Sequence, residues 1–293
     1  MSEEKLNYGQ KNDSLQMKPL EEMDVIDNFL FTAMAYDEET GGEVCRMILE
    51  PVLKRKVGKI HFTAQKVVPG VSETGHGIRM DAFIMEDDDG TGMTDADVYD
   101  IEPDKNESQK RFLPKRVRYY GDLIDVQLLS TGTDYDQLPK LVMVFILSYD
   151  PFGQNAMYYE AGTVLKTHPV VPYDDGIRRI YLYTGGDLPK NADKYDIDLQ
   201  KLLKYIAKST AENITDDTTK RLDEIVKSTK KKKAIGVKYM KSWERERELI
   251  EEVRREEREK VVAAEQRADN AEARADTAEA KLAKYIEKYG DVI

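Results

Sequence analysis

Two short apolar segments that carry carboxylates in their interiors constrain the fold of this chain more than any other feature. The first reads Ile-Arg-Met-Asp81-Ala-Phe-Ile, and the second, at residues 98–105, contains Glu102 and Asp104. Two glycines lie in the acidic connection between the segments, so the pattern predicts a β-hairpin with a long polar tip. A carboxylate inside a strand with a buried face is costly unless a cation neutralises it.

The positions of these acids are compatible with a metal site. Glu102 and Asp104 are two residues apart and share one face of a strand, and Asp81 is expected on the neighbouring strand. Their oxygens would suit a divalent cation. The alternative is that they are ordinary surface charges, as we expect for the acidic run at residues 86–89. The next segment, 109–118, has five bases and no acid. Metal-binding carboxylates beside groups that can bind phosphate are what phosphodiester hydrolysis requires.

These residues bring the chain close to a known family. The chain resembles the PD-(D/E)XK nuclease superfamily, most closely its transposase-like branch of recombination-promoting nucleases (the Rpn family), over residues 23–185. The pieces that carry the resemblance are Asp-Asn-Phe-Leu-Phe at 27–31, Gly-Glu-Val-Cys-Arg-Met-Ile-Leu at 42–49, Ile-Arg-Met-Asp at 78–81, Tyr-Asp-Ile-Glu at 99–102, Leu-Pro-Lys-Arg-Val-Arg-Tyr-Tyr-Gly-Asp-Leu-Ile-Asp at 113–125, Leu-Pro-Lys-Leu-Val-Met-Val-Phe-Ile-Leu at 138–147 and Tyr-Asp-Pro-Phe-Gly at 149–153.

The resemblance implies an α/β fold with a restriction-endonuclease-like mixed β-sheet core flanked by helices. It also implies a metal-dependent DNA endonuclease that uses Mg²⁺, with Mn²⁺ as a possible substitute, and that is linked to recombination, mobile elements or defence. By resemblance, Asp81 and Glu102 are the metal carboxylates and Glu43 is the third acidic group. Without the resemblance, Glu43 reads equally well as an acid favoured by the dipole at a helix start.

One position departs from the family pattern. The superfamily has Lys two residues after the strand Glu, and this branch often has Gln, whereas this chain has Asp104. An ionised Asp cannot donate a hydrogen bond to water or phosphate. Asp104 is therefore either an extra metal ligand or a sign that the site has lost its catalytic activity. Lys105 reaches the same face only if a bulge at Pro103 re-aims it. A catalytically inactive fold that binds DNA and oligomerises remains the alternative.

A helix is predicted at residues 113–129, with Pro114 in its favourable first turn. By resemblance it lies beside the metal site, and its polar residues are candidates to contact the DNA backbone or to orient the carboxylates. These candidates are Lys115, Arg116, Arg118 and Tyr120. The alternative for the tyrosine pair at 119–120 is a packing role.

The remaining pattern divides the chain into four parts. They are a mobile tail at 1–20, the nuclease-like domain at 21–188, a small helical segment at 189–238 and a long helix at 239–289. The other predicted elements are helices at 22–36, 43–53, 198–207 and 216–225 and strands at 59–68, 141–147, 157–165 and 178–183. Four lysines at 230–233 are expected to be a solvated stretch between helices.

Composition narrows the partners and the compartment. The net charge of −11 argues against a general electrostatic attraction to nucleic acid, so DNA binding would depend on a local basic patch. A single cysteine, Cys45, excludes an internal disulfide and fits a reducing compartment. Long apolar runs and a signal-peptide core are absent from the sequence, so we expect a cytoplasmic protein without a membrane partner. The three histidines lack zinc-site spacing.

The last fifty residues contain an internal repeat. Arg-Ala-Asp-Asn-Ala-Glu-Ala at 267–273 is followed by Arg-Ala-Asp-Thr-Ala-Glu-Ala at 274–280, then by Lys-Leu-Ala. The seven-residue period forms two rows three or four residues apart, which predicts a C-terminal coiled coil. The rows are Ala264, Ala271, Ala278 and Tyr285, and Val261, Ala268, Ala275, Leu282 and Tyr289. We expect a homo-oligomer, although alanine layers bury little area; the alternative is a lone charged helix.

Overall fold

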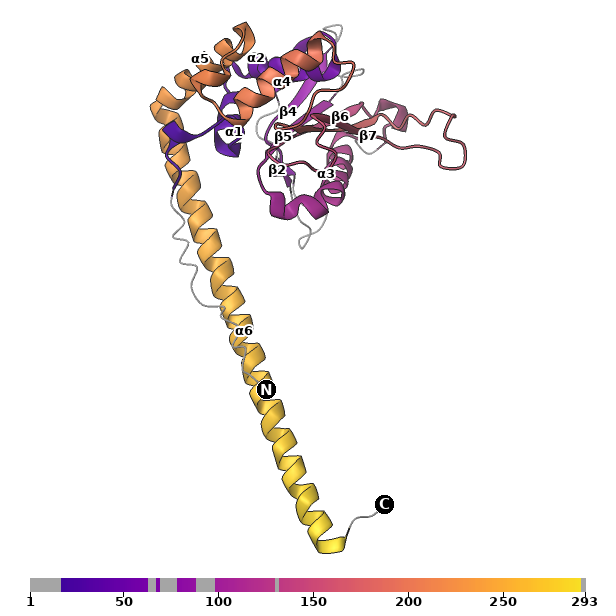
Figure 1. Ribbon diagram of the computed structural model, residues 1–293, viewed down its shortest axis with the longest axis vertical. Coiled ribbons are helices and arrows are strands. Elements are labelled where there is room, and N and C mark those ends of the chain that lie inside the picture. Colours follow the sequence, from indigo (N-terminus) through magenta and orange to yellow (C-terminus); the bar gives the residue numbers. More distant parts are fainter. Residues whose placement is uncertain (1–16, 63–66, 69–77, 88–97, 130–131, 291–293) are drawn as a thin grey trace. The chain divides into compact units, whose positions relative to one another are not determined.

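The computed structural model describes residues 17–62, 67–68, 78–87, 98–129 and 132–290. The chain divides into two compact units (Figure 1). One is Lys18–Gly236, a mixed α/β unit built on a six-stranded sheet, and the other contains the C-terminal helix from Val237 onward. The α/β class with a mixed sheet and a long C-terminal helix is as predicted.

The helices and strands have the following bounds. The α-helices are α1 Asn28–Ala35, α2 Gly41–Leu53, α3 Leu113–Leu128, α4 Lys194–Ala207, α5 Asp217–Lys231 and α6 Lys233–Tyr289. The 3₁₀ turns are η1 Leu20–Glu22, η2 Glu107–Phe112, η3 Tyr135–Gln137 and η4 Ala211–Asn213. The strands are β1 Lys59–Phe62, β2 Val67–Val68, β3 Ile78–Arg79, β4 Phe83–Asp87, β5 Val98–Asp104, β6 Leu141–Leu147, β7 Tyr158–Ala161 and β8 Ile177–Tyr183.

The main sheet has the strand order β1-β4-β5-β6-β8-β7. Strands β1, β4 and β5 are antiparallel neighbours, β5, β6 and β8 are parallel, and β7 returns antiparallel to β8. The parallel pairing of β5 with β6 needs a crossover, and α3 supplies it. All seven residues of β6 are buried, as predicted for an apolar strand covered on both faces.

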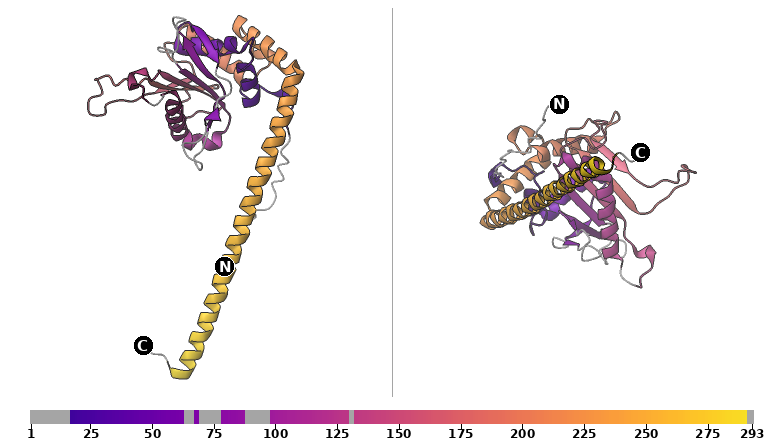
Figure 2. Two further views of the ribbon diagram at one scale, coloured as in Figure 1. Left: turned by 180° about the vertical axis from the view of Figure 1, so that it is seen from behind. Right: turned by 90° about the horizontal axis from the view of Figure 1, so that it is seen from below.

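The two faces of this sheet are covered by different helices (Figures 1 and 2). Helix α3 packs on one face through Val117 and Ile124, which share a buried cluster with Phe83 of β4, Met143 of β6 and Tyr181 of β8. Helices α1, α2 and α4 lie on the other side. Because side chains alternate along a strand, Val98, Asp100, Glu102 and Asp104 all point to the α3 side of β5.

The predicted hairpin is present, but it differs from the prediction at one end. Strands β4 and β5 pair antiparallel, with Phe83 opposite Asp100. Asp81 was predicted inside the first strand; it instead occupies a bend between β3 and β4. The predicted strand at 59–68 is also divided, because β1 pairs with β4 while β2 pairs with β3 in a separate two-stranded sheet.

The expectation of a fully solvated acidic tip is wrong at Glu86. This side chain is buried in β4 and accepts hydrogen bonds from both terminal nitrogens of Arg55, at 2.8 and 2.7 Å. The hydroxyl of Tyr99 on β5 also donates to it. Burial, which raises the pKa of Glu86, is outweighed by these hydrogen bonds, and its pKa is lowered. Residues 88–89 of the tip, and residues 1–16 of the predicted tail, lie outside the described residues.

The predicted small helical segment packs on the rest of the α/β unit. Helix α4 packs on α2 and α5 packs on α1 and α4, so the α/β unit continues to Gly236. Two of the four lysines at its end form hydrogen bonds or ion pairs within the protein, although we expected a solvated stretch. Lys230 donates to the carbonyls of Glu21 and Met23, at 3.0 and 2.6 Å, and Lys232 forms an ion pair with Asp37.

Helix α6 is a single helix of 57 residues that includes the predicted coiled-coil segment. It has no proline, and its only glycine is Gly236 near its start. Within the described part of the chain, none of the helices is long and apolar enough to cross a membrane.

Candidate metal and nucleic-acid site

The carboxylates of Asp81 and Glu102, predicted as a pair, lie together. The backbone N–H of Asp81 donates to Oε1 of Glu102 across 2.9 Å, and the N–H of Ile101 donates to the carbonyl of Ala82 across 3.0 Å. The bend before β4 is thus bonded to the end of β5, as a continuation of the hairpin ladder. Both side chains are nearly fully buried.

Helix α1 holds the Asp81 side chain from the other direction. The amide of Asn28 donates to Oδ2, and the hydroxyl of Thr32 donates to Oδ1 at 3.2 Å. Asn28 and Thr32 are four residues apart, so both project from one face of α1 toward the same carboxylate. Two neutral donors fix the orientation of Asp81 and leave its negative charge in place.

Asp100 is the third carboxylate of this group, and the sequence analysis did not single it out. It is fully buried, two residues before Glu102 on the same face of β5. Among the described residues, its side-chain oxygens have no hydrogen-bond donor other than the neighbouring Glu102 carboxyl, which can donate only when it is protonated. Burial, together with the negative charge of Asp81, raises the pKa of Asp100 to about 7. Burial and the charges of Asp100 and Asp81 also raise the pKa of Glu102 well above its usual range.

A buried carboxylate with no donor other than a second acid is rare in proteins and usually has a functional or ligand-related reason. The donor set here consists of carboxylate oxygens, which is the chemistry that Mg²⁺ and Mn²⁺ prefer. Among the described residues, no group of three or more His, Cys, Asp or Glu side chains is arranged so that it could hold a metal ion as it stands. The chemistry of Asp81, Asp100 and Glu102 fits a divalent cation, and the lack of a donor to Asp100 other than Glu102, among the described residues, is the observation behind that fit.

Asp104 is not directed at this group. Its carboxylate forms an ion pair with Arg116 of α3 and accepts hydrogen bonds from the Tyr149 hydroxyl at 3.0 Å and from the N–H of Asn106. Burial lowers the pKa of Arg116, but the bond to Asp104 outweighs it and the pKa is raised. Asp104 and Arg116, predicted as an extra metal ligand and as a phosphate contact, form an ion pair with each other in this structure.

Lys105 lies at the rim of the site. Its ammonium is 2.7 Å from Oδ1 of Asp27, whose other oxygen accepts from Lys18 at 2.6 Å. Burial raises the pKa of Asp27, but these two lysines outweigh it and the pKa is lowered. Asp27 contacts Lys105 while the next residue, Asn28, contacts Asp81, so one short segment of α1 joins the rim to the carboxylates.

Glu43 forms its hydrogen bonds with Arg221 and not with the three buried carboxylates. Its two carboxylate oxygens accept hydrogen bonds from Nε and from a terminal nitrogen of Arg221 on α5, each at 2.9 Å. This pair lowers the pKa of Glu43. The structure gives Glu43 a partner on an exposed helix surface, and the third acid that lies with Asp81 and Glu102 is Asp100.

The predicted phosphate-binding residues of α3 divide into two kinds. Lys115 and Arg118 are exposed, on the outer face of the helix, and remain available to a ligand. Tyr120 is half-buried on the inner side, and burial together with the charge of Glu102 raises its pKa to about 12. Its hydroxyl therefore stays protonated at neutral pH, close enough to the carboxylates to feel their charge.

A shallow hollow lies at the start of α3, where Pro114 is part of its lining. It has a volume of about 560 Å³ and lies between η2 and Phe152, with Lys110 and Arg111 in its lining. The guanidinium of Arg111 stacks 4.4 Å from the ring centre of Phe112. Cationic and aromatic side chains together favour a sugar-phosphate backbone.

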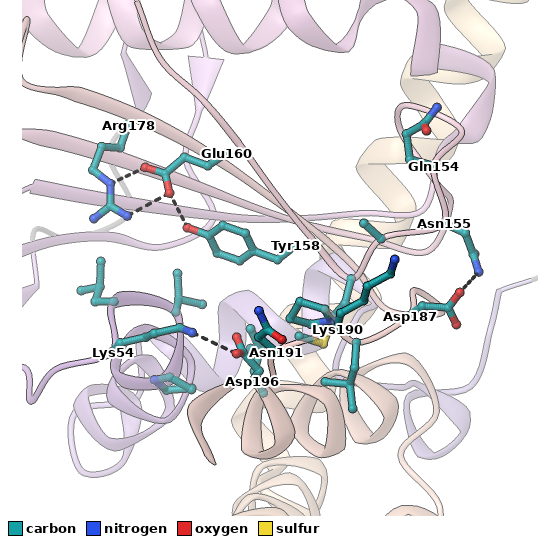
Figure 3. A pocket seen from close by; sticks show the side chains of 18 residues that line it. Lys54, Gln154, Asn155, Tyr158, Glu160, Arg178, Asp187, Lys190, Asn191 and Asp196 are labelled. Atoms are coloured by element: carbon teal, nitrogen blue, oxygen red, sulfur yellow. Dashed lines mark hydrogen bonds and ion pairs between the residues drawn. The ribbon is translucent and has the colours of Figure 1, made fainter. Parts of the chain in front are cut away.

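A second cavity, of about 790 Å³, lies between the C-terminal end of α2, β7 and the start of α4 (Figure 3). Most of its charged side chains pair with one another. Arg178 is bonded to Glu160, whose other partner is the Tyr158 hydroxyl, and Lys54 bonds Asp196 at 2.9 Å. With these charges neutralised internally, the cavity offers less to a charged ligand than the acidic site does.

Period-two alternation along β5 would have found Asp100, because it places residues 100, 102 and 104 on one face. The i, i+4 spacing of Asn28 and Thr32 was visible as well, but it says nothing about the strand that the helix covers. Comparisons with family models, curated proteins and solved structures find no match for this chain.

Proposed function

We propose that this chain is a metal-dependent DNA endonuclease that hydrolyses phosphodiester bonds. The observation that carries the proposal is the group of three buried carboxylates, Asp81, Asp100 and Glu102, in which Asp100 has no donor other than the Glu102 carboxyl among the described residues. Buried anions without a cation are unfavourable, and a divalent ion is the simplest group that satisfies them. The mixed sheet flanked by helices is in keeping with the resemblance to PD-(D/E)XK nucleases of the Rpn family.

Each part of the site has a role in this proposal. Asp81, Asp100 and Glu102 hold the metal, while Asn28 and Thr32 fix the orientation of Asp81. A bound Mg²⁺ or Mn²⁺ lowers the pKa of water and neutralises phosphate charge. Lys105, at the rim, stabilises negative charge that develops on the phosphate, in place of the Lys that the family has two residues after the strand Glu.

DNA reaches the site along the basic side of α3. Lys115 and Arg118 bind the sugar-phosphate backbone, and the hollow at Lys110 and Phe152 receives the adjoining backbone. Because the chain carries a net charge of −11, this local patch has to supply most of the attraction. By resemblance, the cutting serves recombination, mobile elements or defence, in the cytoplasm, where the buried Cys45 stays reduced.

The second candidate function is a catalytically inactive nuclease fold that binds DNA as an assembly module. The observation that favours it is Asp104. The position that carries Lys or Gln in the family carries a carboxylate bonded to Arg116 and Tyr149, so no side chain two residues after Glu102 can donate to water.

The test is nicking of supercoiled plasmid by the full chain with Mg²⁺ or Mn²⁺, with Asp81→Asn, Asp100→Asn and a chelator as negative controls. Glu160→Gln, which removes a carboxylate on β7, is the matched positive control. Cleavage lost in the two variants and kept in the control supports the nuclease. If wild type binds DNA without metal and does not cut, the inactive module is correct.

Metal binding has its own measurement, independent of cleavage. Calorimetric titration of Mn²⁺ into wild type should show one saturable site, which Asp100→Asn weakens and Glu160→Gln leaves unchanged. Equal binding by all three proteins would remove Asp100 from the metal site.

A further inference from the structure

The C-terminal segment of α6 carries opposite charges along the two sides of its apolar seam. Val261 is taken as the first residue of a heptad. The residue immediately before the first residue of each heptad is then always basic. These residues are Lys260, Arg267, Arg274, Lys281 and Lys288. The other row of the seam contains Ala264, Ala271 and Ala278. The residue immediately after each of these alanines is acidic, at Glu265, Glu272 and Glu279.

The seam itself is exposed in the single chain. The exposed fractions of Val261, Leu282, Tyr285 and Tyr289 are 56, 59, 60 and 59%. All described residues from 251 to 290 are exposed. Alanines fill the middle of the seam, so it is narrow there and lets another backbone approach closely.

Between residues 265 and 279 the spacing does not bring acids and bases together within one helix. Neighbours on a helix surface are three and four residues apart. At these distances acids meet acids, in a row formed by Glu265, Asp269, Glu272, Asp276 and Glu279. The ion pairs along the described part of α6 occur upstream of this row, at Arg247–Glu251 and Arg255–Glu252. Like charges at this spacing destabilise an isolated helix.

A second copy of the chain supplies the missing partners in only one orientation. In a parallel pair in register, the basic side of one helix faces the acidic side of the other. Each basic residue lies opposite the acidic residue of the partner whose number is five higher. Lys260 then meets Glu265 of the partner, Arg267 meets Glu272 and Arg274 meets Glu279, each pair twice. In an antiparallel pair, basic residues face basic residues and acids face acids, which is repulsive.

We infer that residues 260–289 form a parallel, in-register two-stranded coiled coil with a second copy of this chain. This goes beyond the nuclease proposal and is independent of it. Upstream of Lys260 the same positions carry Glu246 and Glu251, which repel each other in this arrangement, so the paired segment begins near Lys260.

The charge pattern can be tested with two triple variants of the full chain. The basic variant is Glu265→Lys/Glu272→Lys/Glu279→Lys, and the acidic variant is Lys260→Glu/Arg267→Glu/Arg274→Glu. In sedimentation equilibrium, wild type should have twice the chain mass at high concentration. Each variant alone should need about a hundredfold more protein to pair, and an equimolar mixture should regain the two-chain mass.

A matched control carries the same change in charge away from the seam. Asp269→Lys/Asp276→Lys/Glu287→Lys alters the outward positions and should leave the two-chain mass intact. Wild type that is monomeric at every concentration, a mass above two chains, or equal loss of pairing in the control would each overturn the inference.

Orientation is tested by disulfide formation at two seam positions. Ala264→Cys and Ala278→Cys are tested as separate variants of the full chain, with Ala273→Cys on the outer surface as control and wild type to account for the buried Cys45. In a parallel pair in register, both seam variants cross-link on mild oxidation and the control does not. An antiparallel pair has one two-fold axis across its seam, so at most one of the two variants would cross-link. Such a result would overturn the parallel arrangement.

Discussion

The backbone N–H of Asp81 donates a 2.9 Å hydrogen bond to Oε1 of Glu102, joining a bend before β4 to the last residues of β5. This bond orients the Glu102 carboxylate and keeps it beside two other buried acids. A side chain at position 102 needs an acceptor oxygen for the fold and a negative charge for the proposed metal, and the two needs can be separated by mutation.

Glu102→Gln keeps an acceptor for the Asp81 N–H but removes the charge. Loss of a group that merely orients a metal ligand costs roughly 10- to 100-fold, so we expect Mn²⁺ affinity and plasmid cleavage to fall at least that far. The Tm of the metal-free protein should be unchanged or higher, because a neutral amide replaces a carboxyl whose raised pKa shows that it is costly to ionise where it is buried. A variant that cuts like wild type would remove Glu102 from the reaction.

The metal-free protein should lose stability as pH rises from about 4 to about 7. The pKa of Asp100 is raised from 3.8 to about 7 by burial and by the charge of Asp81. A carboxyl with a raised folded-state pKa stabilises the fold below its unfolded pKa, and this contribution is lost as pH rises through the folded pKa. One such group changes the free energy of unfolding by about 1.4 kcal/mol per pH unit in the window.

Chemical denaturation in chelator at several pH values measures this slope. Asp100→Asn should flatten it, and saturating Mg²⁺ should restore stability to wild type at neutral pH. Asp125, whose pKa burial and Asp122 raise to about 6, and Glu102, whose pKa is also raised, contribute in the same direction, so Asp125→Asn and Glu102→Gln are the controls that separate their shares from that of Asp100. An unchanged slope in Asp100→Asn would mean that this carboxyl does not titrate in the window.

Asp104 and Arg116 should be energetically coupled. Their ion pair is largely buried, and Tyr149 adds a hydrogen bond to the same carboxylate. We expect a coupling energy of about 1–3 kcal/mol in a double-mutant cycle of Asp104→Asn and Arg116→Gln, measured by urea denaturation. Coupling near zero would show that the pair contributes nothing to stability and would leave Arg116 available to DNA.

Lys115→Gln/Arg118→Gln should weaken DNA binding and reduce its salt dependence. Each lost phosphate contact lowers the slope of log K against log salt by about 0.9, so the double variant should lose about 1.8 from the wild-type slope. Fluorescence anisotropy of labelled duplex DNA measures it. Lys190→Gln/Lys208→Gln removes the same charge elsewhere on the exposed surface and should leave the slope near its wild-type value.

Glu43→Gln should retain metal binding and cleavage, because Glu43 faces Arg221 and not the buried carboxylates. The resemblance makes the opposite prediction. Calorimetric Mn²⁺ titration and plasmid nicking of this variant, beside Asp100→Asn, decide which acid is the third ligand. A loss of both properties in Glu43→Gln with normal folding would restore the assignment that the resemblance implies.

The sequence predicted correctly those features that patterns of neighbouring residues determine, and it missed contacts between residues that are distant in sequence. The buried strand at Leu141–Leu147 and the Asp81–Glu102 pair follow from apolar runs and alternation, and both are present. Glu43 was assigned by the resemblance, which does not reveal the neighbouring helix in this chain. Arg221, 178 residues away in sequence, forms its contact. Arg116 reads as a free base in the sequence because Asp104 meets it only after α3 folds over the sheet.

The alanine seam of α6 has a consequence for dosage. Small side chains bury little area in each layer, so we expect paired and single chains to interchange, with the amount of paired protein rising faster than the total amount of protein. Both chains of a parallel pair enter the coil at the same end, so a pair carries two acid groups on one assembly and a single chain carries one. Under the proposed function, a single chain therefore brings one such group to DNA and a pair brings two, so the amount of protein in the cell would set how many groups meet the DNA at once.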